Sequence, residues 1–135
     1  MRLKALVWIL RPGPGGSPEV LLLERPRRRG GGEHPVTGKA EPGEKPLVCA
    51  EREAQEETGL RGELAELGMV HRYRAVRGAF EEHAFLMTVP RRAEPELSTE
   101  HVAFRWVAPD EARAALHWKA HRETLDAALV KWAAL

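Results

Sequence analysis

The sequence predicts an α/β fold in which helices cover a mixed β-sheet. Two observations support this class: apolar segments of strand length recur along the chain, and segments whose apolar residues repeat at helical spacing lie between them. No apolar run approaches the ~20 residues that a membrane-spanning helix needs, so no membrane partner is expected. With 135 residues the chain can bury one core, and we expect a single domain over residues 1–135.

The first two strands are predicted at residues 3–10 and 19–24. Their sequences, LKALVWIL and EVLLLE, are almost wholly apolar, and the turn signal PGPGGSP separates them. The glycines of this turn do not form a phosphate-binding loop, because such a loop ends in Gly-Lys-Ser/Thr. The next segment, RPRRRGGGEHP at residues 25–35, combines like charges with glycines and is predicted to be an exposed, mobile loop.

A helix is predicted from Pro46 to Thr58. Proline is tolerated in the first turn of a helix, where its missing N–H would have no partner, and Gly59 is a typical C-terminal stop. Three more strands and two more helices are expected after it. The strands are predicted at residues 63–74, 80–89 and 103–108, and the helices at 109–116 and 121–135.

Charge, cysteine and histidine content exclude several classes of function. A net charge of +1 lacks the basic excess of a general nucleic-acid binder, so no stable nucleic-acid complex is expected. Cys49 is the only cysteine, which excludes an internal disulfide and suits the reducing cytoplasm, and its expected role is packing within the predicted helix. Four histidines lack zinc-like spacing and are assigned no metal: His34, His71, His83 and His121. The expected oligomeric state is a monomer or a homodimer.

The helix predicted after residue 46 carries three carboxylates on one face, those of Glu53, Glu56 and Glu57. At about 100° per residue they fall within about 100° of one another, while Glu51 points to the far side. Like charges at these spacings destabilise a helix by roughly 0.2–0.5 kcal/mol per pair unless a cation or solvent compensates them. Clustered oxygen ligands suit Mg²⁺, with Mn²⁺ as a substitute, and such an ion would also bridge to phosphate. The alternative is a solvated acidic face with Arg52 as its counterion.

A longer pattern surrounds these glutamates. Five residues separate Gly38 from Glu44, seven more lead to Arg52-Glu53, and Ala-Gln-Glu-Glu-Thr-Gly-Leu follows. This spacing matches every fixed position of the Nudix box, G-x5-E-x7-R-E-U-x-E-E-x-G-U with U an apolar residue, so the chain resembles the Nudix hydrolases. The resemblance implies the Nudix fold, a mixed β-sheet in an α/β/α sandwich whose box forms a loop–helix–loop. It also implies hydrolysis of a nucleoside diphosphate linked to another group.

The same resemblance implies roles for the residues of the box. Glu53, Glu56 and Glu57 would bind the divalent metal ion. Glu44 would assist from the loop, and Arg52 would orient the acidic side chains. Water activated by the metal would attack a phosphorus of the substrate, with a glutamate as general base. Glu53 and Glu56 are the two alternatives for that base.

The likeness extends beyond the box to a narrower group. HPVTGKAEPGE, HRYRAVRG, EEHAFLMTVP and STEHVAFRWVAPDEARAALHW are similar to segments of the bacterial dihydroneopterin triphosphate pyrophosphatases of folate biosynthesis, Nudix enzymes also described as acting on dATP. This likeness implies a further metal ligand, Glu100, for which a solvated loop acid is the alternative. It also implies that Arg25 and Thr37 contact the substrate. His117 stands where that group has a serine, so the expected pterin contact there departs from the pattern.

The resemblance predicts Mg²⁺-dependent cleavage of a (deoxy)nucleoside or dihydroneopterin triphosphate to a monophosphate and pyrophosphate. Gly38 and Tyr73 complete the predicted substrate contacts, because the Tyr73 ring can stack on a flat heterocycle; packing at the rim of the core is its alternative role. Diadenosine polyphosphate and 8-oxo-dGTP hydrolases share the box and stay open as alternatives, as does a non-catalytic nucleotide-binding module. ADP-ribose hydrolases fit less well, because the proline that they carry past the box is absent between Leu60 and Pro90.

Overall fold

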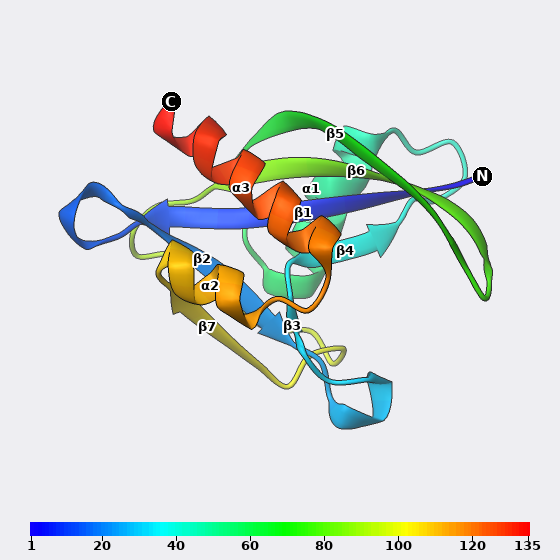
Figure 1. The fold of residues 1–135 in the computed structure, drawn as a ribbon, viewed down its shortest axis with the longest axis horizontal. Helices are drawn as coiled ribbons and strands as arrows, with labels where there is room; N and C mark the ends of the chain where they lie inside the picture. Colours follow the sequence, from blue (N-terminus) through cyan, green and yellow to red (C-terminus); the bar gives the residue numbers. More distant parts are fainter.

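The structure, a computed structural model, describes residues 1–135 and contains three α-helices, seven β-strands and two 3-10 helices (Figure 1). Along the chain these are β1 Arg2–Pro12, η1 Pro14–Gly16, β2 Pro18–Glu24, η2 Arg27–Arg29, β3 Glu33–His34, β4 Val36–Lys39, α1 Pro46–Thr58, β5 Glu63–Ala75, β6 Gly78–Thr88, β7 Ala103–Val107, α2 Pro109–Ala115 and α3 Lys119–Ala133. Every predicted helix and strand is present, with ends that differ by no more than two residues. None of the helices has the length and apolar character needed to cross a membrane.

All seven strands belong to one sheet. Its main path runs β3-β2-β1-β6-β5, with β4 bonded to β1 and β7 bonded to β2. The central strand β1 runs parallel to β6 and antiparallel to β2 and β4. The sheet is therefore mixed, as the sequence predicts.

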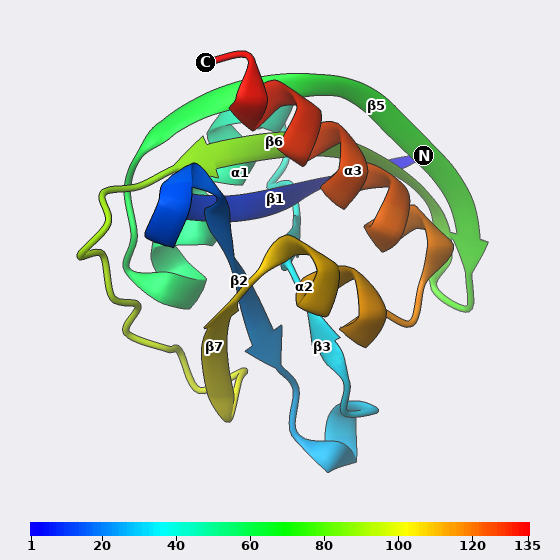
Figure 2. The same ribbon diagram turned by 60° about the vertical axis from the view of Figure 1, so that its left-hand side comes forward.

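The central strand separates two hydrophobic clusters. Every residue of Ala5–Leu10 is buried, and successive side chains of a strand point to opposite faces. The odd-numbered residues of this segment enter the cluster that α1 covers, and the even-numbered ones enter the cluster that α2 and α3 cover. Figure 2 shows α3 lying across β1, β5 and β6, with α1 behind the sheet. These three layers confirm the predicted α/β/α sandwich.

The helix α1 has the ends that the sequence predicts. Pro46 occupies its first turn, and Gly59 follows its last residue with a φ of 70°, a left-handed conformation that glycine adopts without strain. The Gly59 N–H donates to the carbonyl oxygen of Gln55 at 2.8 Å. Small residues, among them Cys49 and Ala54, form its buried side, which confirms the packing role predicted for the cysteine.

The segment at residues 25–35 differs from the exposed loop that the sequence predicts. Its middle, which includes η2, is exposed, but His34 and Pro35 are buried and β3 pairs with β2. The prediction is therefore wrong for the end of this segment. Strand pairing and the buried histidine attach that part of the backbone to the sheet.

Candidate active site

The glycine that begins the sequence motif brings β4 against the acidic face of α1. A Cβ atom at Gly38 would lie 2.0 Å from Cδ and 2.3 Å from Oε2 of Glu53, so only glycine leaves room for that carboxylate. The missing side chain thus allows Glu53 of the helix to contact the strand.

Replacing Gly38 with alanine is expected to lower kcat at least ~10-fold with little change in the thermal midpoint, because the methyl group would displace the Glu53 carboxylate from its position. The carboxylate is the end of a flexible side chain and can move without shifting the backbone. Gly62→Ala is the matched control: its Cβ would lie 2.1 Å from the backbone oxygen of Thr88, so it should lower the midpoint. Measuring kcat and the midpoint of both variants tests the contact, and an unchanged kcat in Gly38→Ala would contradict it.

Arg52 joins three carboxylates of the motif. Its Nε and Nη2 donate to the two oxygens of Glu44 at 2.8 Å each, and these hydrogen bonds lower the pKa of Glu44 to about 2. Its Nη1 donates to Glu53 at 2.9 Å and to Glu56 at 3.1 Å. Nη2 also donates to the carbonyl oxygen of Lys39 at 3.0 Å. One guanidinium therefore connects the loop, the strand β4 and the helix α1.

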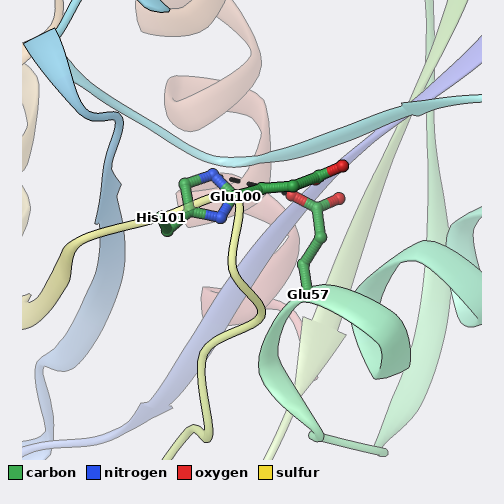
Figure 3. Close-up of side chains that lie close together, drawn as sticks. All are labelled: Glu57, Glu100 and His101. Atoms are coloured by element: carbon green, nitrogen blue, oxygen red, sulfur yellow. Dashed lines mark ion pairs between the residues drawn. The ribbon is translucent and has the colours of Figure 1, made fainter. Parts of the chain in front are cut away.

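A second group of ligating side chains lies at the C-terminal end of α1. Figure 3 shows Glu57 extending from the helix toward Glu100 and His101, which lie in the loop between β6 and β7. One ligand atom from each of the three residues lies within 4.8 Å of the others. Glu57 and His101 are buried and Glu100 is exposed, so the cluster faces solvent on the side of Glu100.

Backbone hydrogen bonds hold the loop that carries Glu100 against α1. The N–H of Glu96 donates to the carbonyl oxygen of Thr58 at 2.8 Å, and the N–H of Ser98 donates to that of Glu57 at 3.2 Å. Both carbonyls belong to the last turn of the helix, where they have no partner within the helix itself. The end of α1 therefore positions the loop as well as its own glutamate.

The environment of Glu57 fits a divalent cation. This residue is only 3% exposed, its Oε2 has no hydrogen-bond partner, and its Oε1 lies 3.7 Å from Nε2 of His101. Burial, followed by the hydrogen bond and charge of Glu53 and the charge of Glu100, raises the pKa of Glu57 to about 9. A buried oxygen without a partner costs about 1–3 kcal/mol, and a metal ion would supply that partner. Carboxylate oxygens are ligands that suit Mg²⁺ and Mn²⁺.

Of the other predicted ligands, Glu53 lies against β4 and Glu56 lies toward solvent. Glu53 is close enough to Glu57 to affect its pKa, and it is also bound by Arg52. The side chain of Glu56 is 58% exposed and contacts Arg52. The structure thus brings Glu57 and Glu100 together, places Glu53 between them and the guanidinium, and leaves Glu56 at the solvent edge.

Two buried histidines were not predicted as residues of the site: His101 belongs to this cluster, and His34 adjoins it. Nδ1 of His34 donates to the carbonyl oxygen of Pro35, since a carbonyl only accepts, so Nε2 of the same ring is an acceptor. The Nε2 of His101, 3.1 Å away, is then the donor between the two rings. His101 directly follows the predicted ligand Glu100, and this adjacency is the one sequence signal for it. For His34 the sequence contains no comparable signal.

The buried His34 is expected to make the fold less stable in mild acid. Burial, then the charges of Arg25, His101 and His121, lower the pKa of His34 to about 3. In mild acid this imidazole is therefore protonated in the unfolded chain but stays neutral in the folded chain. Stability should fall as the pH drops below about 6.5, by about 1.4 kcal/mol per pH unit for one proton. Urea unfolding of wild type and His34→Gln from about pH 7 to about pH 4 tests this, since the variant should show the shallower slope. Parallel slopes would contradict it.

The predicted substrate residues divide between the two faces of the sheet. Gly38 lies on the α1 side. Thr37 lies on the α3 side, because it is paired with Leu6 of the second cluster, and Tyr73 follows the same alternation on β5. His117 is exposed just before α3. The structure therefore does not gather these residues at one point.

Arg25 connects the acidic cluster with a cavity at the end of β2. Burial and then the charge of Arg25 lower the pKa of His101, which places this guanidinium near the cluster. The cavity has a volume of about 480 Å³. Its lining consists of Glu24, Arg25, Pro26, Arg27, Gly30, Gly31, Gly32 and Val102. A substrate phosphate at the cluster would lie within the field of Arg25.

The chain is similar in sequence to one much longer curated protein. An octanoyltransferase of Myxococcus xanthus is 40% identical over 121 residues, which are 86% of this chain and 34% of that protein. The chain therefore spans about a third of the length of this curated relative. The match shows that the two sequences are similar; it does not assign the activity of the longer protein to this chain.

Solved structures share the fold over nearly the whole chain. An Ap4A hydrolase of C. elegans in a binary complex has a TM-score of 0.86 and 22% identity, with 100% of both chains covered. The E. coli dihydroneopterin triphosphate pyrophosphohydrolase has a TM-score of 0.81 and 20% identity, with 96% of this chain and 95% of that chain covered. The MutT protein of Methanosarcina mazei Go1 has a TM-score of 0.74 and 22% identity, with 93% and 90% covered. At these identities the similarity establishes the fold.

The family assignment comes from the sequence as a whole. The family model of the NUDIX domain matches residues 1–128, which include the motif from Gly38 to Leu60 and the outlying Glu100. The structure adds the loop–helix–loop that this motif forms and the acidic cluster at its end. The chain therefore belongs to the Nudix family, a family of hydrolases that act on phosphoanhydride bonds.

Proposed function

We propose that this chain is a Mg²⁺-dependent pyrophosphohydrolase that cleaves a (deoxy)nucleoside or dihydroneopterin triphosphate to a monophosphate and pyrophosphate. Mn²⁺ would substitute for Mg²⁺. The observation that carries the proposal is the buried, partnerless oxygen of Glu57 beside Glu100, at the end of a helix whose other carboxylates Arg52 holds in place. Such an arrangement binds a hard cation and, through it, phosphate oxygens.

Each residue of the site has a task in this reaction. The carboxylates that would hold the divalent ion are those of Glu57, Glu100, Glu53 and Glu56. When bound, the ion lowers the pKa of water and neutralises phosphate oxygens. Arg52 positions Glu53 through its hydrogen bond at 2.9 Å. Glu53 or Glu56 takes the proton of the attacking water. The protein contributes mainly positioning and charge, since phosphoryl transfer needs little covalent participation.

A diadenosine polyphosphate is the second candidate substrate, and one observation favours it. Arg2, Lys39 and Arg77 make no ion pair with a carboxylate, and the charges of Arg2, Arg77 and Lys4 lower the pKa of Lys39. A phosphate chain longer than a triphosphate would neutralise these cations. The whole-length likeness to a protein named as an Ap4A hydrolase is consistent with this candidate.

The same proposal covers the binding partner, the cellular location and the oligomeric state of the enzyme. The partner is a small-molecule nucleotide or pterin triphosphate, without a stable nucleic-acid complex. The lone, buried Cys49 is compatible with the cytoplasm as its location, and the active unit would be a monomer or a homodimer.

A substrate panel tests the proposal. Dihydroneopterin triphosphate, dATP, 8-oxo-dGTP and diadenosine tetraphosphate are each incubated with Mg²⁺ or Mn²⁺, and the products are identified by mass. Monophosphate and pyrophosphate from a triphosphate are the expected result, and fastest turnover of the dinucleotide would favour the second candidate. Tight nucleotide binding without any phosphate release under either metal would overturn both and identify a binding module.

A further inference from the structure

A row of polar side chains crosses four strands on the face that α3 covers. Lys39 of β4 is paired with Lys4 of β1, Lys4 is paired with Glu82 of β6, and Glu82 is paired with His71 of β5. Side chains two residues further along β1 and β6 belong to the apolar cluster beneath α2 and α3, so the row continues that face. We call these four residues the polar row.

Glu82 is the one buried member of the polar row. Its side chain is only 8% exposed, yet its nearest cation, Nζ of Lys4, lies 3.8 Å from Oε2. Lys4 divides its ammonium group between this carboxylate and the hydroxyl of Tyr73, to which Nζ donates at 3.0 Å. Burial raises the pKa of Glu82. One ammonium at 3.8 Å compensates the burial of this carboxylate only in part, so a donor from outside the chain would stabilise it.

A buried polar atom without a partner lies in the same neighbourhood. Nδ1 of His121, in the first turn of α3, is buried and has no hydrogen-bond partner. Burial and then the charges of Arg25, Lys4 and His71 lower the pKa of His121 to about 4. Two of these three groups belong to the polar row, which places the histidine close to it. The first turn of α3 thus adds a buried nitrogen without a partner near the polar row.

Strand β4 connects the polar row with the glutamates of α1. Lys39 of the row directly follows Gly38, which contacts Glu53, and the Lys39 carbonyl oxygen accepts from Arg52 at 3.0 Å. Strand β4 is bonded only to β1, so its other edge is free. Tyr73, which is 38% exposed, lies on the row's face. A ligand with a flat ring on the row and phosphates over the edge of β4 would therefore reach the acidic cluster.

We propose that Glu82 recognises the ring of the substrate, accepting hydrogen bonds from the adjacent ring N–H and amino group of a 2-amino-4-oxopyrimidine, the ring portion that guanine and pterins share. Lys4, beside it, donates to the ring carbonyl. This inference rests on the proposed function, because it names the substrate class of the same enzyme.

The order of donors and acceptors selects this ring. Along its edge a guanine or pterin presents a carbonyl acceptor, an N–H donor and an amino donor. The row presents an ammonium donor and then a carboxylate with two acceptor oxygens. Adenine has an acceptor nitrogen beside its amino group, so it would leave one carboxylate oxygen opposite a lone pair. Sites that hydrogen-bond a substrate group reject an analogue without that group strongly.

The test compares GTP with ITP, which lacks only the amino group, in wild type, Glu82→Gln and Glu81→Gln. Wild type should prefer GTP by at least ~10-fold in kcat/KM, and Glu82→Gln should bring the ratio within ~3-fold, chiefly through KM for GTP. Glu81 is the matched control, since it lies on the opposite face of β6 and is bound to His83 and Arg72. Dihydroneopterin triphosphate, added as a third substrate, distinguishes the two sources of the ring by its kcat/KM relative to GTP.

Equal use of GTP and ITP by wild type would overturn the inference, and so would an unchanged ratio in Glu82→Gln. The wild-type comparison requires no variant to fold. Equilibrium binding of GMP and IMP separates this inference from the proposed function. Preference for GMP without any triphosphate hydrolysis would refute the proposed hydrolase activity and support recognition of the ring by Glu82. Hydrolysis of both triphosphates without preference between the two rings would support the hydrolase activity and refute recognition of the ring by Glu82.

Discussion

Replacing Glu57 with glutamine is expected to lower kcat at least ~100-fold while leaving the metal-free protein as stable as wild type. Because burial raises its pKa to about 9, the Glu57 carboxyl is protonated near neutral pH in the absence of metal, and a glutamine amide has nearly the same shape and no charge. Only a bound cation requires the ionised form. The Mg²⁺- or Mn²⁺-dependent rise of the thermal midpoint should therefore disappear together with the activity.

Glu51→Gln is the control for this variant. Glu51 lies on the same helix, is exposed and points away from the acidic cluster, so its loss should change neither kcat nor the metal-dependent midpoint. Calorimetric titration with Mn²⁺ gives a readout that does not depend on turnover. A Glu57→Gln protein that still takes up Mn²⁺ with wild-type affinity would remove this residue from the metal site.

Local signals explain why the helix of the site can be predicted from the sequence. Pro46 and Gly59 act within one turn of the chain, and the box fixes the intervals between Gly38 and the glutamates. Helical angles also predict that Glu53, Glu56 and Glu57 share one face of the helix. The structure adds a gradient of burial across that face, from the exposed Glu56 to the buried Glu57. That gradient depends on where the rest of the chain covers the helix.

Contacts between distant segments explain what the sequence could not predict. His34 meets His101 only because β3 pairs with β2 and the loop after β6 is bonded to the end of α1. Glu82 lies beside Lys4 because β6 runs parallel to β1 in one register. A shift of one residue in that register would move Glu82 to the other face of the sheet. Neither pairing leaves a periodic pattern in the sequence.

Replacing Arg52 with lysine is expected to lower kcat at least ~10-fold and to lower the thermal midpoint, although the charge is retained. The guanidinium reaches both oxygens of Glu44 at 2.8 Å while it also holds Glu53 and the Lys39 carbonyl. A single ammonium lacks the planar fork that makes these bonds together. Without the guanidinium, the loop that carries Glu44 should detach from the helix. Glu53 should then be able to move away from Gly38. Parallel measurements of kcat and the midpoint with and without Mg²⁺ test both effects.

Arg113→Lys provides the matched substitution at a surface ion pair. Arg113 donates to Asp126 at 2.8 Å, but both side chains are 47% exposed, and such pairs contribute about 0–1 kcal/mol. This variant should therefore resemble wild type in activity and midpoint. If Arg52→Lys resembles it too, positive charge alone holds the acidic residues, and the fork geometry is not needed. If only Arg52→Lys loses activity, the enzyme depends on the directions of these hydrogen bonds, because the net charge is the same in both variants.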